Sequence, residues 1–247
     1  MVTQPDDLQA RVIRTPPDAC GVLTLVGTPI GNPDDFSARG IQTLRNADLI
    51  ACEEFKEARR LLRRHSIDVP LLEINEHTET ADASDVIDAL MEGKNVALIS
   101  DCGMPIFADP GSRLVELALA SGLCVNTVPG PTSLTTALVL SGFDITRFYF
   151  YGFLSPKRPE RVAELRTLKS HPSLLVFLDA PYRLNQLLAD LAEVFGTERR
   201  ACVACDLTLD TEHVERGTIA AVRKYFMAHP EKREFVVLLE SARRRSR

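Results

Sequence analysis

The chain has 247 residues, 45% of them hydrophobic and 26% charged, and its formal net charge is −5. This composition is typical of a globular protein, and the sequence has no run of roughly 20 apolar residues such as a membrane-spanning helix needs. The acidic balance argues against a protein that binds nucleic acid over its whole surface. Residues 1–19 are polar and lack the apolar run of a signal peptide, so we expect a flexible N-terminal extension on a cytoplasmic protein.

Short apolar runs alternate with amphipathic segments in the first half of the chain. The predicted strands are Val22–Val26, Leu49–Cys52, Leu71–Ile74, Val96–Ile99 and Cys124–Val128. The predicted helices cover residues 37–46, 54–65, 84–91, 111–121 and 132–141. Continuous apolar runs separated by amphipathic helices are typical of a mostly parallel sheet that is covered on both faces.

The pattern resets near residues 142–146, and a second alternating series follows. Its predicted strands are Phe148–Tyr151, Leu174–Leu178, Arg200–Cys205 and Phe235–Leu239. Its predicted helices cover residues 159–168, 182–194 and 219–226. We therefore predict an α/β protein of two α/β domains, residues 20–143 and 144–240, with mostly parallel or mixed sheets and a basic tail at 241–247.

The six cysteines are predicted to be reduced thiols, because a chain of this length builds a core without disulfides. Cys202 and Cys205 form a single C-x-x-C without a second pair or a nearby histidine cluster. A zinc site needs more ligands than this pair supplies, so we predict no metal site and expect both cysteines to pack within a strand.

Three loops rich in glycine and proline follow predicted strands of the first domain. They are Gly27–Asn32, Ser100–Gly111 and Pro129–Ser133. Ordinary turns use the same residues, but ligands of open α/β sheets bind beyond the carboxyl ends of the strands, where glycine lets the backbone approach them. Three such loops together predict a ligand pocket. The sequence lacks both the Gly-Lys-Ser/Thr ending of an NTPase loop and the G-x-G-x-x-G of a dinucleotide oxidoreductase.

Several motifs in chain order carry a resemblance to a known family. They are Thr28–Asn32 with Asp35 and Arg39, then Ser100–Gly111, Pro129–Pro131, Gly152–Leu154 and Arg216–Thr218. Over residues 20–240 they resemble the bacterial ribosomal-RNA ribose 2′-O-methyltransferases of the tetrapyrrole methylase superfamily. The resemblance implies two α/β domains with S-adenosylmethionine in the cleft between them, and a homodimer. It also implies methylation of a cytidine ribose in small-subunit (16S) ribosomal RNA. C-methylation of a tetrapyrrole and a cofactor-binding module without catalysis are the alternatives.

The sequence departs from this family at several positions. The resemblance implies that these positions face the substrate. After Cys52 and Glu53 the family usually has an acid, threonine and arginine, where this chain has Glu54, Phe55 and Lys56. Three further departures are Asn75 for a histidine, Tyr182 for the histidine of Pro-His-Arg, and Cys205–Leu209 for Arg-Glu-Leu-Thr-Lys. The cofactor loops are kept, so methyl transfer is better supported than the particular RNA target.

The resemblance also assigns residues to the cofactor. They are Pro29, Asp101, Gly103, Ile106, Thr132, Ser133, Leu178 and Leu207. Two of these assignments compete with structural roles. Asp101 and Gly103 are also residue types that commonly form a turn at the end of a strand. The hydroxyl of Thr132 stands at the start of a predicted helix, where hydroxyls commonly cap the helix.

Four polar residues are candidates for catalysis: Glu53, Glu54, Glu76 and His77. The sulfonium already activates the methyl group, so the enzyme must align the attack and accept the proton of the nucleophile. A carboxylate or an imidazole beside a ribose hydroxyl would do so. The competing interpretation is that Glu54 stabilises the start of a helix through its dipole and that His77 is an ordinary surface histidine.

Basic residues form three clusters: Arg59–His65, Lys157–Arg161 and Arg243–Arg247. Such patches bind phosphates even on an acidic protein, although a solvated helix face has the same composition. We predict that ribosomal RNA contacts the first two clusters. The residues assigned to it are Arg60, Arg63, Arg64, Lys157, Arg158 and Arg161.

Overall fold

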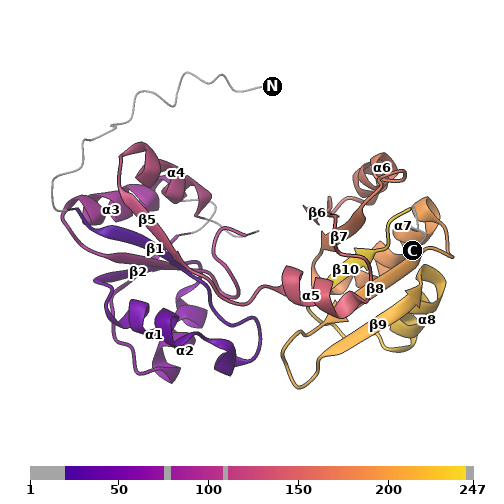
Figure 1. Cartoon of the computed structure of the whole chain (residues 1–247), viewed down its shortest axis with the longest axis horizontal. Helices are drawn as coiled ribbons and strands as arrows, with labels where there is room; N and C mark the ends of the chain where they lie inside the picture. Colours follow the sequence, from indigo (N-terminus) through magenta and orange to yellow (C-terminus); the bar gives the residue numbers. More distant parts are fainter. Residues whose placement is uncertain (1–19, 75–78, 108–110, 243–247) are drawn as a thin grey trace. The chain divides into compact units, whose positions relative to one another are not determined.

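The computed structural model describes residues 20–74, 79–107 and 111–242. The predicted extension at 1–19, the candidates Glu76 and His77, and tail residues 243–247 lie outside the described residues. The chain folds into two compact units, which Figure 1 colours from indigo to magenta and from magenta to yellow. The first unit contains residues up to Pro29 and Pro33–Pro131, and the second contains Ile30–Asn32 and the chain from Thr132 onward.

The first unit is built on a parallel sheet with the strand order β3-β2-β4-β1-β5. Its strands are β1 (Val22–Val26), β2 (Leu49–Cys52), β3 (Leu71–Glu73), β4 (Val96–Ile99) and β5 (Cys124–Val128). Its helices are α1 (Ala38–Arg45), α2 (Phe55–Arg64), α3 (Glu79–Met91) and α4 (Ser112–Ala120), with a 3-10 turn at Pro33–Asp35. The parallel sheet predicted from continuous apolar runs is confirmed.

Helices cover both faces of this sheet, α3 and α4 on one and α1 and α2 on the other (Figure 1). Successive side chains of a strand point to opposite faces, which is visible in β4. Leu98 packs in the core under α3 and α4, whereas Ala97 and Ile99 pack in the core under α1 and α2. A strand buried on both faces must be apolar throughout, as the sequence of β4 is.

The second unit has a mixed sheet with the order β6-β7-β10-β8-β9, in which only β6 and β7 pair in parallel. Its strands are β6 (Phe148–Phe153), β7 (Leu174–Leu178), β8 (Arg200–Cys205), β9 (His213–Thr218) and β10 (Phe235–Leu239). Its helices are α5 (Ser133–Ser141), α6 (Arg158–Thr167), α7 (Leu184–Phe195) and α8 (Ile219–Ala228), with a 3-10 turn at Pro181–Arg183.

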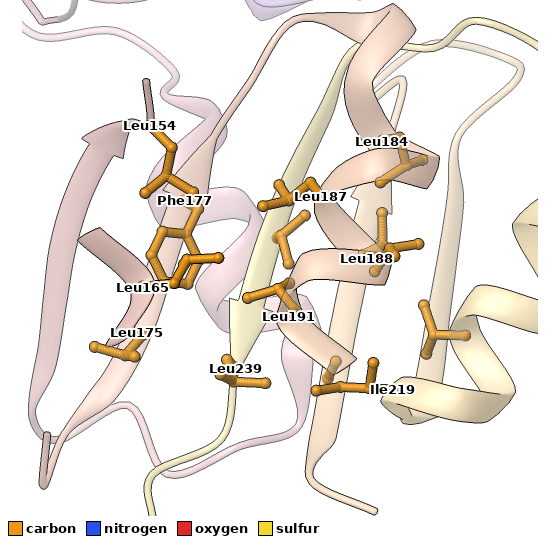
Figure 2. Close-up of a cluster of buried hydrophobic side chains, with 14 of the residues drawn as sticks. Leu154, Leu165, Leu175, Phe177, Leu184, Leu187, Leu188, Leu191, Ile219 and Leu239 are labelled. Atoms are coloured by element: carbon orange, nitrogen blue, oxygen red, sulfur yellow. The ribbon is translucent and has the colours of Figure 1, made fainter. Parts of the chain in front are cut away.

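The core of this unit lies on both faces of β7 and β10. On one face, α6, α7 and α8 contribute to a cluster in which Phe177, Leu187 and Leu191 are completely buried (Figure 2). On the other face, α5 packs through Leu134 and Leu138 against the opposite side of the same strands. Each fully buried Leu or Phe side chain of this kind stabilises the fold by about 1.5–3 kcal/mol.

Two features of this unit differ from the sequence-based expectation. The boundary was predicted at 143/144, whereas the two units separate after Pro131, because α5 packs on β8, β9 and β10. Strand β9 was not predicted, since it lies at the edge of the sheet and Val214 is its only aliphatic residue, beside the charged Glu215 and Arg216.

The C-x-x-C lies within β8, as expected. Cys202 belongs to the core on the α5 face and Cys205 to the core on the opposite face. The two thiols therefore point away from each other and cannot ligate one ion. Burial raises the pKa of the Cys202 thiol to about 11 and that of the Cys205 thiol to about 12, which keeps both protonated.

Candidate active site

The three loops rich in glycine and proline meet at one edge of the first sheet. They follow β4, β1 and β5, which are neighbours and parallel, so their carboxyl ends lie together. The backbone ties the loops to one another. The N–H of Thr28 donates to the carbonyl of Gly103 at 2.8 Å, and the N–H of Gly27 donates to the carbonyl of Val128 at 2.9 Å. The buried hydroxyl of Thr28 also reaches the carbonyls of Ser100 and Gly103, each at 3.4 Å.

Gly27 and Gly130 are glycines because the loops after β1 and β5 touch there. A Cβ on Gly27 would lie 2.6 Å from the nitrogen and 2.7 Å from the Cα of Gly130. A Cβ on Gly130 would lie 2.8 Å from the Cα of Gly27. The N–H of Gly130 points to the sulfur of Met104 at 3.3 Å, which brings the third loop into the same contact.

The loop after β4 has an unusual backbone. Gly103 has a φ of 80°, and Ile106 has a φ of 73°. A β-branched residue at positive φ is rare and costs energy, and such residues cluster at functional sites. Ile106 is held there by packing against the core under α3 and α4. The strain therefore lies in the loop that the sequence assigned to the cofactor.

A hydrogen bond joins the ends of β2 and β4. The N–H of Glu54, the N-cap residue just before α2, donates to a carboxylate oxygen of Asp101 at 3.3 Å. Desolvation raises the pKa of the Asp101 carboxyl, the hydrogen bond from Glu54 opposes this, and the charges of Glu54 and Glu57 raise it further. Asp101 and Glu54 are exposed, and half-buried Glu53 directly follows β2. Two of the four catalytic candidates thus lie beside the cofactor loops.

The cofactor candidates fall into the two units. Pro29, Asp101, Gly103 and Ile106 belong to the first. Thr132, Ser133, Leu178 and Leu207 belong to the second. Thr132 has the structural role that the sequence left open, since its hydroxyl accepts the N–H of Thr135 at 3.2 Å and caps α5. Leu178 and Leu207 pack in the core on the α5 face.

The short segment Ile30–Asn32 is held by the loop that follows β8. The N–H of Asn32 donates to the hydroxyl of Thr208 at 2.8 Å, and a Cβ on Gly31 would lie 2.6 Å from the carbonyl oxygen of Leu207. Asp206 and Thr208 both have positive φ, 48° and 69°. The close approach of this strained loop accounts for the glycine at position 31 of the first motif.

The side chains predicted to contact RNA differ in their solvent exposure and in how closely they pair with acidic residues. Arg60, Arg63 and Arg64 are exposed on α2. Arg60 lies 3.5 Å from Glu57, and Arg64 lies 3.9 Å from Asp34, so both pairs are loose. Lys157 pairs with Glu160 at 3.2 Å, and Arg158 binds Asp190 at 2.9 Å and Glu193 at 2.6 Å.

Arg161 was predicted to contact RNA, but its side chain is buried in the structure. Its side chain is 1% exposed and its guanidinium lies 2.8 Å from the carboxylate of Asp190, which is equally buried. It also donates to the carbonyls of Ser155 and Pro156, each at 3.1 Å. A guanidinium whose donors are used inside the protein is not available to a phosphate. The sequence could not reveal this, because Asp190 lies on a different helix, α7.

Asp179 is a site candidate that the sequence analysis missed. It follows the last residue of β7, is 3% exposed, and binds the guanidinium of Arg183 and the N–H of Ala180. Its second carboxylate oxygen has no hydrogen-bond partner among the described residues. The sequence did contain a feature that could have indicated Asp179: it is an acidic residue at the end of a buried apolar run, directly after the cofactor candidate Leu178.

The sequence matches the family described as "Tetrapyrrole (Corrin/Porphyrin) Methylases" over residues 22–223. The chain belongs to this family and is a methyltransferase. Among its relatives, the "Ribosomal RNA small subunit methyltransferase I" of Xylella fastidiosa is 40% identical over 90% of this chain and 82% of its own. The protein of the same name from Thermotoga maritima is 38% identical over 89% of this chain and 98% of its own.

Solved structures support the fold. A cobalt precorrin-4 methyltransferase is similar with a TM-score of 0.67 and 17% identity, covering 89% of this chain and 94% of its own. A diphthine synthase has a TM-score of 0.70 and 17% identity, covering 90% of both chains. Within the described ranges, no helix has the length and apolar character needed to cross a membrane.

Proposed function

We propose that this methyltransferase transfers the methyl group of S-adenosylmethionine to the ribose 2′-hydroxyl of a cytidine in 16S ribosomal RNA. The observation that carries the proposal is the similarity over 90% of the chain to relatives named for the small-subunit ribosomal RNA. The loops at the end of β4, β1 and β5 supply a site of the kind that α/β sheets use for ligands.

The chemistry of these loops fits the cofactor. The segments Gly27–Asn32, Ser100–Phe107 and Pro129–Ser133 contain the acidic Asp101 and no lysine or arginine. A site of this charge suits a sulfonium cation and its amino group, and would not suit a phosphate-bearing nucleotide. In this proposal Pro29, Gly103 and Ile106 contact the cofactor beside Asp101. The assignment of Thr132, Ser133, Leu178 and Leu207 stays a prediction.

S-adenosylmethionine supplies a methyl group that its sulfonium already activates. The protein's own task is then to hold the ribose hydroxyl and to accept its proton. We assign proton acceptance to the carboxylate pair after β2, Glu53 and Glu54, with Glu76 and His77 as further candidates. The hydrogen bond from the Glu54 backbone to Asp101 fixes the start of α2 and so positions this pair relative to the cofactor loop.

The substrate would lie on the exposed arginines of α2, with Lys157 and Arg158 as a second contact. Two-fold symmetric dimers are the commonest soluble homo-oligomers, and we propose a homodimer that acts on cytoplasmic ribosomal RNA. Sedimentation tests the dimer: a species of about twice the 27.3 kDa chain mass is expected, and a monomer at micromolar concentration would contradict it.

The function itself is tested by mapping ribose methylation on ribosomal RNA from cells with and without the gene. One cytidine in the 16S RNA should lose its methyl group on deletion and regain it when the gene is restored. An unchanged map would overturn the RNA substrate. Methyl transfer to a tetrapyrrole, or binding of the cofactor without any transfer, would establish one of the two alternatives instead.

A further inference from the structure

A groove runs along one side of α2 and is not part of the loops described above. It is lined by Phe55, Arg59, Leu62 and Arg63 of the helix and by residues 67–71, which lead into β3. Its cavity volume of about 400 Å³ lies within the range of roughly 300–1,000 Å³ typical of ligand sites.

The helix presents this groove because of its residue spacing. Ala58 and Leu62 are buried against the sheet. Phe55, Arg59 and Arg63 recur every four residues, and side chains at that spacing lie on one face of a helix. Phe55 is half-buried, packed at the edge of the core, whereas the two arginines are exposed. The groove therefore has an aromatic floor at one end and guanidinium groups along its wall.

The charges of the groove are left available for an anion. Neither Arg59 nor Arg63 has an acidic partner among the residues that the structure describes, in contrast to their neighbours Arg60 and Arg64. The guanidinium carbon of Arg59 lies 5.3 Å from the centre of the Phe55 ring, which is a cation–π contact. The acid that faces the groove is Asp68, on the opposite wall.

This combination matches one ligand chemistry. Proteins hold single-stranded RNA by stacking bases on aromatic rings and guanidinium planes while basic side chains contact the phosphates. Phe55 directly follows Glu54, which is hydrogen-bonded to Asp101 of the cofactor loop, so the groove starts next to the proposed reaction site.

We infer that the α2 groove binds a nucleotide of the RNA strand adjacent to the methylated one. The base stacks on Phe55 and Arg59, and Arg63 binds the neighbouring phosphate. This inference rests on the proposed function, because it identifies how that substrate is held. It predicts a contribution from the base, which a purely electrostatic surface would not make.

The experiment measures the affinity of the full chain for a 20-nucleotide single-stranded RNA by fluorescence anisotropy. A second probe has the same length and charge but lacks bases. Phe55→Leu keeps an apolar side chain and should weaken RNA binding about tenfold, the size expected for one stacked base, with no change for the abasic probe. Phe55→Tyr keeps the ring and should restore wild-type affinity. Arg63→Gln should weaken both probes and lower the salt slope by about 0.7, one single-strand phosphate contact.

A matched control for charge is Arg166→Gln, an exposed arginine of α6 outside the groove, which should leave both affinities unchanged. The inference is overturned if folded Phe55→Leu and Arg63→Gln bind RNA as the wild type does, or if Phe55→Leu weakens both probes equally. Ribosomal RNA methylation by the wild type is recorded in parallel. Methylation with unaffected groove variants refutes the groove alone, whereas a wild type that neither binds nor methylates RNA refutes the proposed function.

Discussion

Replacing Gly27 by alanine is expected to damage both the stability of the first unit and its affinity for S-adenosylmethionine. The added Cβ would lie 2.6 Å from the nitrogen of Gly130, where ordinary contacts begin near 3.4 Å. The loops after β1 and β5 would have to separate by about 0.8 Å. Gly27 is not among the residues with positive φ, so alanine is acceptable to its backbone and the cost is steric.

Overpacking of this kind costs about 1–3 kcal/mol. For a chain of about 250 residues, each kcal/mol lowers the melting temperature by roughly 2–4 °C, so a fall of about 2–12 °C is expected. Thermal unfolding measures the loss of stability. Calorimetric titration with S-adenosylmethionine measures the loss of affinity, which is expected to be at least tenfold.

Gly142→Ala is the matched control, because that glycine has a φ of 71° and no atom within 4 Å of an added Cβ. It should lose stability from backbone strain alone and keep its cofactor affinity. Wild-type stability and affinity in Gly27→Ala would show that the contact between the two loops does not restrict this position.

Three further predictions concern the Asp101 carboxyl, the Arg161 guanidinium and the cysteine thiols. The pKa of the Asp101 carboxyl is raised in the folded protein. Ionisation of this carboxyl therefore destabilises the folded state once the pH exceeds the ordinary carboxyl pKa. Asp101→Asn should therefore melt higher than the wild type at pH 7 but not at pH 3, while cofactor affinity falls; a lower melting temperature at pH 7 would contradict this. Arg161→Met leaves Asp190 buried with Arg158 as its remaining partner, so urea unfolding should show a loss of about 3 kcal/mol with RNA affinity unchanged. In the native protein a thiol reagent should label exposed Cys102 and Cys124, but should reach three others only after unfolding: Cys52, Cys202 and Cys205.

The sequence predicted the strands of this fold more accurately than its polar details. Buried strands such as β4 and β10 are apolar throughout, and the predicted bounds of both agree with the structure. Strand β9 lies at a sheet edge with one neighbour, so its charged residues can stay in contact with solvent. Its sequence therefore lacks the apolar run by which the buried strands were predicted. Helix α5 was recognised, but its place in the second unit depends on packing against strands far along the chain.

The candidate site was predictable where it depends on the backbone. Glycines and prolines mark the three loops because close approach and positive φ restrict the residue type, as at Gly27 and Gly103. The roles of charged residues were harder to predict, since a charge acts through partners distant in sequence. Arg161 is in a basic cluster by sequence and in a buried ion pair by structure, while the Phe55 groove becomes visible only when α2 is seen beside residues 67–71.

Methylation of a cytidine ribose in 16S ribosomal RNA can be measured directly by methyl transfer in vitro. Purified protein is incubated with S-adenosylmethionine carrying a labelled methyl group and with small-subunit ribosomal RNA, free or in the subunit, from cells that lack the gene. The RNA is digested to nucleosides, which are identified by mass spectrometry. Label is expected in 2′-O-methylcytidine, at close to one per RNA molecule. Label on a base, on another nucleoside, or absent from RNA in the presence of bound cofactor would contradict it.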